Sequence, residues 1–308
     1  MNILFVYKGS IEFDIASANR ILSLSKSLVS LGVDVSIYNI IPTKDKSLNN
    51  NLYGIHIFYP KDFSLIPSKI SIIIGLIYTL PKVIFAKKPH VVYSYGFSFI
   101  QTKLLWIYKY FFDFKLVKEL NEYPLYFLSH NYFRRLLGKL SQPFDNKGLD
   151  AIVVISNFLK DYYAKYISSR TKVFILNMIV DLKRFDIIKT NVNELQIVYC
   201  GSFNNHKDGI LYLIKGYSKF LKISNFKTKL YLIGKGNKSE EQNIDDLIEE
   251  EQIKDSVIKL GLIRKDDIPY YLINASVLIL PRPDSIQAKA GFPTKLGEYL
   301  ASSNPVIV

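Results

Sequence analysis

A polar loop near the end of the sequence holds the residues whose types and spacing best suit chemistry. An apolar run ends at Pro281, and the following segment leads through Gly291-Phe292-Pro293 to a helix predicted to begin near Thr294. The backbone N–H groups and the hydroxyl of such a helix start can hold a diphosphate. Glu298 lies four residues later on the same helix face, where its carboxylate can accept two hydrogen bonds from a ribose diol. The alternative is a surface glutamate on an amphipathic helix.

A second loop, GSFNNHKDG from Gly201 to Gly209, also follows a predicted strand and precedes a predicted helix. Its small residues let the backbone approach a ligand, and the helix start favours a phosphate group. Lys207 adds a point charge for a phosphate oxygen. The alternative is an ordinary strand-to-helix loop.

Alternating strands and helices must position both loops. Continuous apolar runs such as Asn2–Tyr7 and Leu195–Cys200 are typical of buried parallel strands, and segments with helical periodicity separate them. In open parallel sheets, ligands bind beyond the carboxyl ends of the strands. We therefore predict an α/β fold with two tandem Rossmann-like, doubly wound domains.

The strand–helix pattern restarts after a polar stretch at 181–194, which we interpret as a linker. The predicted domains are residues 1–187 and 188–308. The sequence ends in a strand-like run, Pro305–Val308, and parallel strands are normally covered by helices. We therefore expect the second domain to be incomplete, and a shorter native fold is the alternative.

The composition excludes several classes of protein and site. With 308 residues, 49% hydrophobic and 22% charged, the chain is globular rather than disordered. One cysteine, Cys200, excludes an internal disulfide, and the four scattered histidines lack the spacing of metal ligands. The sequence also contains no Asp-x-Asp pair, so we expect neither a metal nor another cofactor.

Positive charge is concentrated in the first part of the chain. Residues 1–190 hold 25 basic and 13 acidic side chains, whereas residues 191–308 hold 15 and 14. We expect the N-terminal half to attract anions such as lipid headgroups or phosphorylated substrates, and the alternative is a solubilising surface. Because the basic residues are dispersed and no recognition motif is present, we do not expect nucleic acid as a partner.

The longest apolar stretch, Ile70–Leu80, is flanked by lysines. It is too short to cross a bilayer, which predicts either an interfacial helix or a core helix. The N-terminus lacks the basic segment of a secretory signal. We therefore expect a cytoplasmic protein, peripheral at the inner face of the membrane.

Several segments together are similar to one enzyme family. GFPTKLGEYLASSNPVIV resembles the donor-site segment of the retaining GT-B glycosyltransferases of family four, the glycosyl transferases group 1. GSFNNHKDG, LYLIGKGN and LGLIRKDDIPYYLINASVLILPR resemble the segments that precede it there, in the same order. The N-terminal half is similar more loosely. The resemblance implies a GT-B fold, in which the first domain binds the acceptor and the second binds the nucleotide-sugar.

The resemblance also implies roles for single residues. Glu298 matches the ribose-binding member of a pair of glutamates, and the other member falls at Ala290. Lys207 matches the basic residue that holds the donor diphosphate, and Ser202 stands where an arginine commonly accompanies it.

Three further matches concern the phosphates and the reaction. Residues Gly291–Thr294, with Phe292 and Pro293 between them, match the phosphate cradle of the family. Gly9 matches the first-loop glycine that lets the donor phosphate approach. No catalytic residue is identified. The candidate is Asn121, where the family often has a histidine, because an amide can hydrogen-bond a sugar hydroxyl but cannot act as an acid or base.

The implied reaction is that of a hexosyltransferase-type enzyme. It moves a sugar from a nucleotide-diphosphate sugar to a glycan or to a polyprenyl-diphosphate-linked acceptor, as in the biosynthesis of surface polysaccharides. The alternatives are an inactive, truncated remnant of such an enzyme and a GT-B nucleotide-sugar epimerase or phosphorylase.

Overall fold

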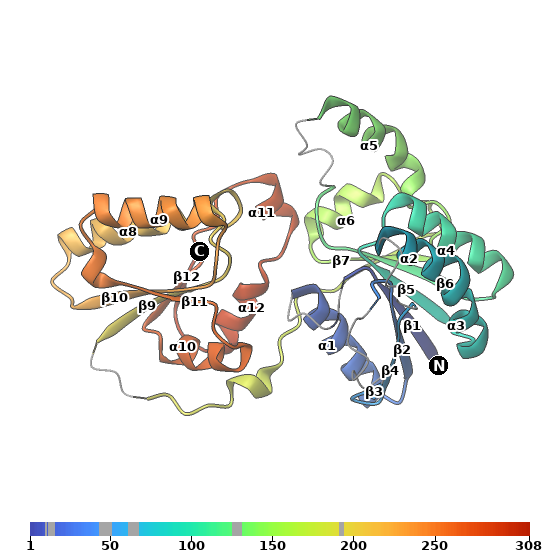
Figure 1. Ribbon diagram of the computed structural model, residues 1–308, viewed down its shortest axis with the longest axis horizontal. Coiled ribbons are helices and arrows are strands. Elements are labelled where there is room, and N and C mark those ends of the chain that lie inside the picture. The colour runs from blue at the N-terminus through green and yellow to red at the C-terminus, as the bar shows by residue number, and fades with distance from the viewer. Residues whose placement is uncertain (10, 12–15, 43–50, 61–67, 125–130, 191–193) are drawn as a thin grey trace. The chain divides into compact units, whose positions relative to one another are not determined.

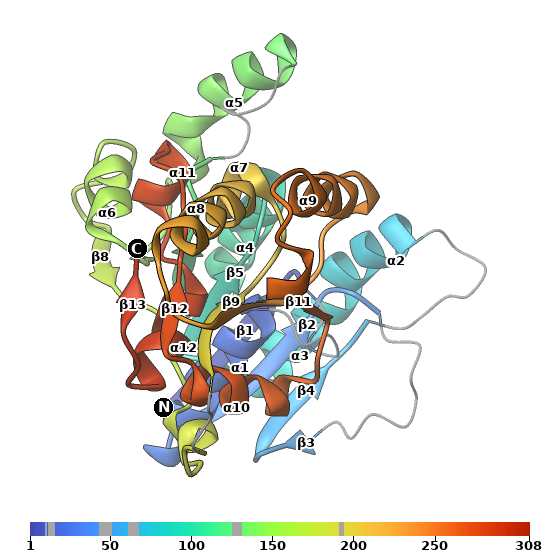
Figure 2. The same cartoon turned by 90° about the vertical axis from the view of Figure 1, so that its left-hand side faces the viewer.

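In a computed structural model, the chain divides into two compact units, Met1–Ile179 (unit 1) and Val180–Val308 (unit 2). The structure describes residues 1–9, 11, 16–42, 51–60, 68–124, 131–190 and 194–308. Figures 1 and 2 show that each unit is a sheet covered by helices. The predicted α/β fold with two Rossmann-like domains is confirmed. The division falls between Ile179 and Val180, whereas the sequence predicted it between residues 187 and 188.

Unit 1 contains a sheet in the order β3-β4-β2-β1-β5-β6-β7-β8. All its strand pairs are parallel except the hairpin β3–β4. The continuous apolar runs form the strands because both faces of a parallel sheet are covered. The strands are β1 Asn2–Tyr7, β2 Asp34–Asn39, β3 Asn51–Leu52, β4 Ile55–Phe58, β5 Val91–Tyr95, β6 Lys115–Leu120, β7 Ala151–Val154 and β8 Lys172–Ile175.

The helices of unit 1 include one long apolar segment. They are α1 Ala16–Ser30, α2 Ser68–Ile74, the π-helical turn η1 Gly75–Thr79, α3 Leu80–Lys87, α4 Phe99–Phe111, α5 Tyr132–Asp145 and α6 Asn157–Ala164. The sequence predicted an apolar stretch of Ile70–Leu80, too short for a membrane, but α2, η1 and α3 are continuous and extend the apolar helical segment beyond Leu80. The 18 residues Ile70–Lys87 have a mean hydropathy of 1.7 and are long and apolar enough to cross one.

The same segment is also anchored in unit 1. Leu76, Leu80 and Ile84 are buried, and the Tyr38 hydroxyl donates a hydrogen bond to the carbonyl oxygen of Gly75 at 2.9 Å. Only 33% of the segment is buried, so its other side is open. The core-helix alternative therefore describes its buried side, and the interfacial alternative stays a prediction.

Unit 2 contains a sheet in the order β11-β10-β9-β12-β13 in which every pair is parallel. Its strands are β9 Leu195–Cys200, β10 Thr228–Ile233, β11 Val257–Gly261, β12 Val277–Ile279 and β13 Val306–Ile307. Its helices are η3 Leu182–Phe185, α7 Asn205–Asp208, α8 Ile210–Ile223, α9 Lys238–Glu250, η4 Lys254–Ser256, η5 Lys265–Asp267, α10 Ile268–Asn274, α11 Ile286–Ala290 and α12 Thr294–Ala301.

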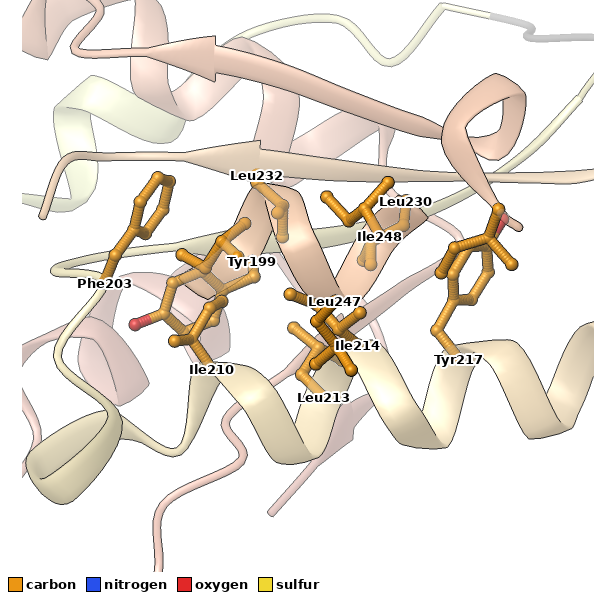
Figure 3. Packing of buried hydrophobic residues seen from close by; sticks show 12 residues of the cluster. Tyr199, Phe203, Ile210, Leu213, Ile214, Tyr217, Leu230, Leu232, Leu247 and Ile248 are labelled. Carbon is orange, nitrogen blue, oxygen red and sulfur yellow. The ribbon is translucent and has the colours of Figure 1, made fainter. Parts of the chain in front are cut away.

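The core of unit 2 follows from the helical spacing of its apolar residues. In α8, Ile210, Leu213, Ile214 and Tyr217 recur at intervals of three and four residues and are buried. Figure 3 shows them facing the side chains of the strands above, among them Leu232. Burying each such side chain stabilises the unit by about 1.5–3 kcal/mol. This packing fixes α8, and with it the loop between β9 and α8.

The stretch 181–194 is not a free linker along its whole length, so this prediction was wrong in part. Its first residues form η3, which the Asp181 side chain caps by accepting a hydrogen bond from the N–H of Lys183. Phe185 is partly buried and packs against the core of unit 2. An apolar side chain in an otherwise polar stretch therefore attaches these residues to unit 2.

Candidate functional site

The two loops singled out in the sequence meet at the carboxyl edge of the unit 2 sheet. Because β9 and β12 are neighbouring parallel strands, the loops that follow them leave the same edge. Gly209 has a left-handed backbone conformation (φ 68°), and a Cβ there would lie 1.9 Å from the carbonyl oxygen of Pro281. Only glycine permits this contact between the loops. The first loop also contains the short helix α7, where the sequence predicted loop alone.

A buried ion pair joins the same two loops. Lys295, the second residue of α12, has its Nζ 2.9 Å from Oδ1 of Asp208, the last residue of α7. The two side chains are only 13% and 6% exposed. Nζ also donates to the hydroxyl of Tyr199 at 2.9 Å and lies over the tyrosine ring. Burial lowers the pKa of Lys295, and the charge of Asp208 opposes that effect.

Two small residues make room for this ion pair. A Cβ on Gly201 would lie 2.0 Å from Nζ of Lys295, so the ammonium group rests directly on the glycine backbone. The Ser202 hydroxyl donates to Oδ2 of Asp208. Within the described residues, two of the three donors of the Lys295 ammonium are used, which leaves one for a ligand. The structure thus places Ser202 in support of Asp208.

The start of α12 is open to a ligand. Among the described residues no side chain caps it, and Pro293 occupies the cap position. The N–H groups of Thr294 and Lys295 therefore have no intrahelical acceptor. The N–H of Gly291 differs, because it donates to the carbonyl oxygen of Gln287 at 3.0 Å at the end of α11. The amide of Gly291 is thus not among the free donors of the predicted cradle.

Lys207 is an exposed cation on the loop that Lys295 reaches. Its backbone N–H donates to Oδ1 of Asn204 at 2.8 Å, which starts α7. Its side chain is exposed, and none of the residues that the structure describes pairs with its ammonium group. Because Lys207 directly precedes Asp208, it lies beside the buried ion pair. Lys207 is thus the neighbour in sequence of the residue that contacts α12, and its role at the start of α12 stays a prediction.

Glu298 lies one turn into α12 and is held by an arginine that the sequence analysis missed. Arg184 of η3 donates from Nη1 to Oε1 of Glu298 at 2.8 Å and from Nη2 to the carbonyl oxygen of Lys265 at 2.7 Å. The Glu298 side chain is 27% exposed, and within the described residues its Oε2 has no partner. One carboxylate oxygen is thus fixed, and the other is free to accept a hydrogen bond.

The one cysteine of the chain lies at this edge but is chemically inert. Burial, with a smaller contribution from the nearby charge of Glu298, raises the pKa of the Cys200 thiol to about 12. The backbone N–H of Cys200 donates to the hydroxyl of Tyr299 at 2.8 Å, which ties α12 to β9. A thiol with so high a pKa is not a nucleophile at neutral pH.

In unit 1, Asn121 follows β6 in a buried polar network. Its Nδ2 donates to Oε1 of Glu119 at 2.7 Å and to the hydroxyl of Tyr95 at 3.2 Å. Its Oδ1 is buried and has no partner within the described residues. The Glu119 carboxylate is itself occupied by Arg20 and by the hydroxyl of Tyr93. The Asn121 side chain is therefore held in one orientation, with its amide oxygen buried.

Gly9 follows β1, where a side chain has no room. A Cβ at Gly9 would lie 1.9 Å from the hydroxyl of Tyr7. That hydroxyl is 2.7 Å from Oγ of Ser17 in α1. The glycine is thus required by packing within unit 1, whatever else it binds.

Among the described residues, no group of three or more His, Cys, Asp or Glu side chains is placed to hold a metal ion. The cationic and N–H groups at the carboxyl edge of unit 2 are chemically suited to hold an anion. The donors of this candidate anion site are the helix start, Lys207 and the remaining hydrogen of the Lys295 ammonium. A carboxylate oxygen of Glu298 lies one helical turn away from them.

The comparisons with known proteins concern both the second unit and the whole fold. Residues 194–308 match the family model described as glycosyl transferases group 1. No curated protein matches the chain. Sucrose-phosphate synthase from Thermosynechococcus elongatus is similar in structure, with a TM-score of 0.76 and 15% identity over 99% of this chain and 80% of that one.

Two further solved structures have a similar fold. HepE of Anabaena, solved in complex with UDP, gives a TM-score of 0.67 at 15% identity over 99% of this chain and 80% of that one. The lipopolysaccharide outer core galactosyltransferase WaaB gives a TM-score of 0.65 at 15% identity, with the same coverage. At this level of identity the likeness concerns the fold, which is that of the GT-B glycosyltransferases.

Proposed function

We propose that this chain is a glycosyltransferase whose donor is a nucleotide-diphosphate sugar and whose acceptor is a hydroxyl of a glycan, because residues 194–308 match the model of the glycosyl transferases group 1. The observation that carries the proposal is the meeting of two loops at one helix start. Lys207, Lys295 and the first turn of α12 gather there, and Glu298 follows one turn later. Support comes from HepE, which was solved with UDP bound.

The anion site would hold the diphosphate of the donor. When the bond between the anomeric carbon and the phosphate oxygen breaks, negative charge grows on the leaving diphosphate. The α12 helix start and Lys207 would stabilise that charge, because donors fixed in advance need no reorganisation during the reaction. Lys295 would add one hydrogen bond, whereas Asp208 balances most of its charge. The family commonly has an arginine at the position of Ser202. Lys295 of α12, paired with Asp208 of α7, would supply the cation that Ser202 does not.

Glu298 would bind the ribose of the donor. Its free Oε2 can accept a hydrogen bond from a diol, while Arg184 holds the other oxygen. A carboxylate held at one oxygen loses less rotational freedom when it binds a ligand. Arg184 is thus a positioning residue, and Glu298 is the residue that touches the nucleotide.

Unit 1 would bind the acceptor. The new bond forms between the acceptor oxygen and the anomeric carbon, while the proton of the acceptor hydroxyl passes to an oxygen of the departing diphosphate. Asn121 cannot take that proton, but its buried Oδ1 can accept a hydrogen bond from a sugar hydroxyl. We expect the acceptor to be a glycan or a lipid-linked glycan of a surface polysaccharide, because WaaB and other enzymes of similar fold build lipopolysaccharide. A cytoplasmic enzyme at the inner membrane face would meet such an acceptor.

A nucleotide panel tests the proposal. The melting temperature of the full chain is measured with UDP, GDP and ADP and with the corresponding sugar nucleotides. A ligand present at 100 times its Kd should stabilise the fold by about 2.7 kcal/mol. Glu298→Gln serves as the matched control and should respond less. No shift with any nucleotide would contradict the proposal and favour an inactive remnant.

A second arm separates transfer from the alternative reactions. The chain is incubated with the stabilising sugar nucleotide alone, with and without EDTA. A transferase leaves most of the donor intact until an acceptor is added, and we expect EDTA to have no effect. Conversion of the donor alone into an epimer would identify an epimerase instead.

A further inference from the structure

Helix α5 of unit 1 is amphipathic, but its apolar face is exposed, whereas a core helix buries that face. Its large apolar side chains recur at helical spacing and are exposed, whereas Gly138 and Gln142 on the other side are buried. Gln142 donates to the hydroxyl of Tyr162 in α6. The exposed apolar residues are Tyr132, Phe133, Leu136, Leu137, Leu140 and Phe144. A helix that faced only water would lose stability from this arrangement, so the apolar stripe requires an apolar partner.

The neighbouring helix also exposes apolar side chains. Helix α4 packs against α5 and exposes Ile100, Trp106, Tyr110 and Phe111. The hydroxyl of Tyr108 in α4 donates to the carbonyl oxygen of Leu76, which joins α4 to the half-open segment 68–87 (Figure 1). Ile73, Ile77 and Tyr78 of that segment are exposed as well. Three consecutive helical segments of unit 1 thus expose apolar side chains, and contacts join α4 to the other two segments.

The charges on these segments indicate what the surface contacts. The segments 68–87, 99–111 and 132–145 contain eight basic residues and one acidic residue. Arg135 and Lys139 are exposed on α5 beside the apolar stripe. Basic residues beside exposed Trp, Tyr, Phe and Leu suit the boundary between anionic headgroups and acyl chains. A second copy of this chain fits less well, because it would bring two positively charged faces together.

We propose that α4 and α5 of unit 1 form a surface that binds an anionic lipid bilayer. The apolar side chains enter the headgroup–acyl boundary, and Arg135 and Lys139 contact lipid phosphates. The inference rests on the proposed function, because membrane binding would bring the enzyme to a lipid-linked acceptor. Its test does not depend on nucleotide binding, so the two can fail separately.

The test is sedimentation of the full chain with vesicles of phosphatidylcholine alone and of phosphatidylcholine with 30% phosphatidylglycerol. The wild-type chain should bind the anionic vesicles at least tenfold more tightly, and binding should weaken as salt rises. Arg135→Glu/Lys139→Glu should lose at least tenfold in affinity. Lys215→Glu/Lys219→Glu is the matched control, because these two lysines are exposed on α8 of unit 2 at the same spacing. It should bind as the wild type does.

A second variant tests the apolar contribution. Phe133→Ser/Leu137→Ser/Leu140→Ser should also lose at least tenfold in binding, and Ile223→Ser/Phe226→Ser in unit 2 should not, although both of its residues are exposed. An unchanged melting temperature shows that each variant is folded. The proposal is overturned if the wild type fails to bind anionic vesicles at low salt, or if the α5 variants bind as the wild type does. A dimer in light scattering that the α5 variants dissociate would also overturn it in favour of a second copy.

Discussion

Each unit carries an arginine–glutamate pair close to the carboxyl edge of its sheet, and the two pairs differ in what they leave free. In unit 1, Arg20 and Glu119 are 2% and 0% exposed, and both carboxylate oxygens have protein partners. In unit 2, Glu298 is 27% exposed and keeps one oxygen open. The same chemical pair thus serves structure when it is fully buried and partnered, and can bind a ligand when one acceptor remains.

The partners of the two arginines explain the difference. Arg20 also donates to the carbonyl oxygens of Leu176 and Asn177, so it joins α1 to the chain that follows β8. Arg184 joins η3 to the carbonyl oxygen of Lys265 and orients the carboxylate of Glu298. The Arg20 contacts stabilise the buried interior of unit 1, whereas the Arg184 contacts hold the Glu298 side chain in place at an accessible edge.

Breaking the buried pair should have the largest effect. Glu119→Gln leaves the Arg20 charge buried without its counter-ion, which should lower the free energy of unfolding by about 3–5 kcal/mol. Urea denaturation measures this. The matched change Glu298→Gln should cost less than about 1 kcal/mol, because that pair is partly exposed. Equal losses in the two variants would remove the distinction between the pairs.

The Lys295–Asp208 pair should combine both properties. Lys295→Met leaves Asp208 buried and uncompensated, and should destabilise the chain by about 2–3 kcal/mol. Adding Asp208→Asn should restore most of that stability but not the affinity for nucleotide, which we expect to fall about tenfold. Denaturation and calorimetric titration measure the two quantities. Full recovery of nucleotide affinity in the double variant would show that the pair is only structural.

Unit 1 also contains a buried lysine, Lys118. Burial lowers the pKa of Lys118 in β6 to about 8, an effect that Asp145 opposes and Lys103 adds to. Lys118→Met should therefore raise the free energy of unfolding at pH 7 by about 2 kcal/mol. Urea denaturation at pH 7 checks this gain. A loss of stability would mean that the lysine has a partner it needs.

The same lysine predicts a dependence on pH. Between about pH 8 and pH 10.5, the native state releases the Lys118 proton while the unfolded state still holds it. The unfolded state then binds more protons, so the free energy of unfolding contributed by this group rises with pH. The advantage of Lys118→Met over the wild type should thus shrink across this range. A constant advantage from pH 7 to pH 9.5 would contradict the lowered pKa.

The exposed cation should have the smallest effect on folding. Lys207→Ala should change the free energy of unfolding by less than about 0.5 kcal/mol, because its side chain is exposed. It should weaken nucleotide diphosphate binding about tenfold, through the loss of a charge-assisted hydrogen bond. Lys219→Ala, an exposed lysine of α8, is the control and should leave binding unchanged. Equal affinities in both variants would remove Lys207 from the site.

The sequence predicted the elements well because their signals are local. Continuous apolar runs became the parallel strands, and apolar residues at helical spacing, as in α8, became buried helix faces. Gly209 and Lys207 were found because a loop between a strand and a helix has a local pattern. The fold and the position of the loops thus follow from residues close together in the chain.

The residues that the sequence did not predict contact partners that lie far away along the chain. Arg184 lies 114 positions before Glu298, and Asp208 lies 87 positions before Lys295, so no local pattern pairs them. Phe185 and the amide of Gly291 also find partners that the local sequence does not indicate. The one available signal for Lys295 was its position directly after Thr294, which places a cation in the first turn of the predicted helix.

The pairing of Glu298 with a ribose diol is tested most directly by a cycle that removes each partner in turn. Calorimetric titration compares UDP, GDP or ADP, whichever binds, with its 2′,3′-dideoxy form, on the wild type and on Glu298→Ala. In the wild type, removal of the diol should lower the affinity about 10- to 100-fold, as expected when hydrogen bonds to a charged acceptor are lost. In the variant, the two ligands should bind within about threefold of each other. An equal loss in both proteins would contradict the account, since Glu298 would then not touch the ribose.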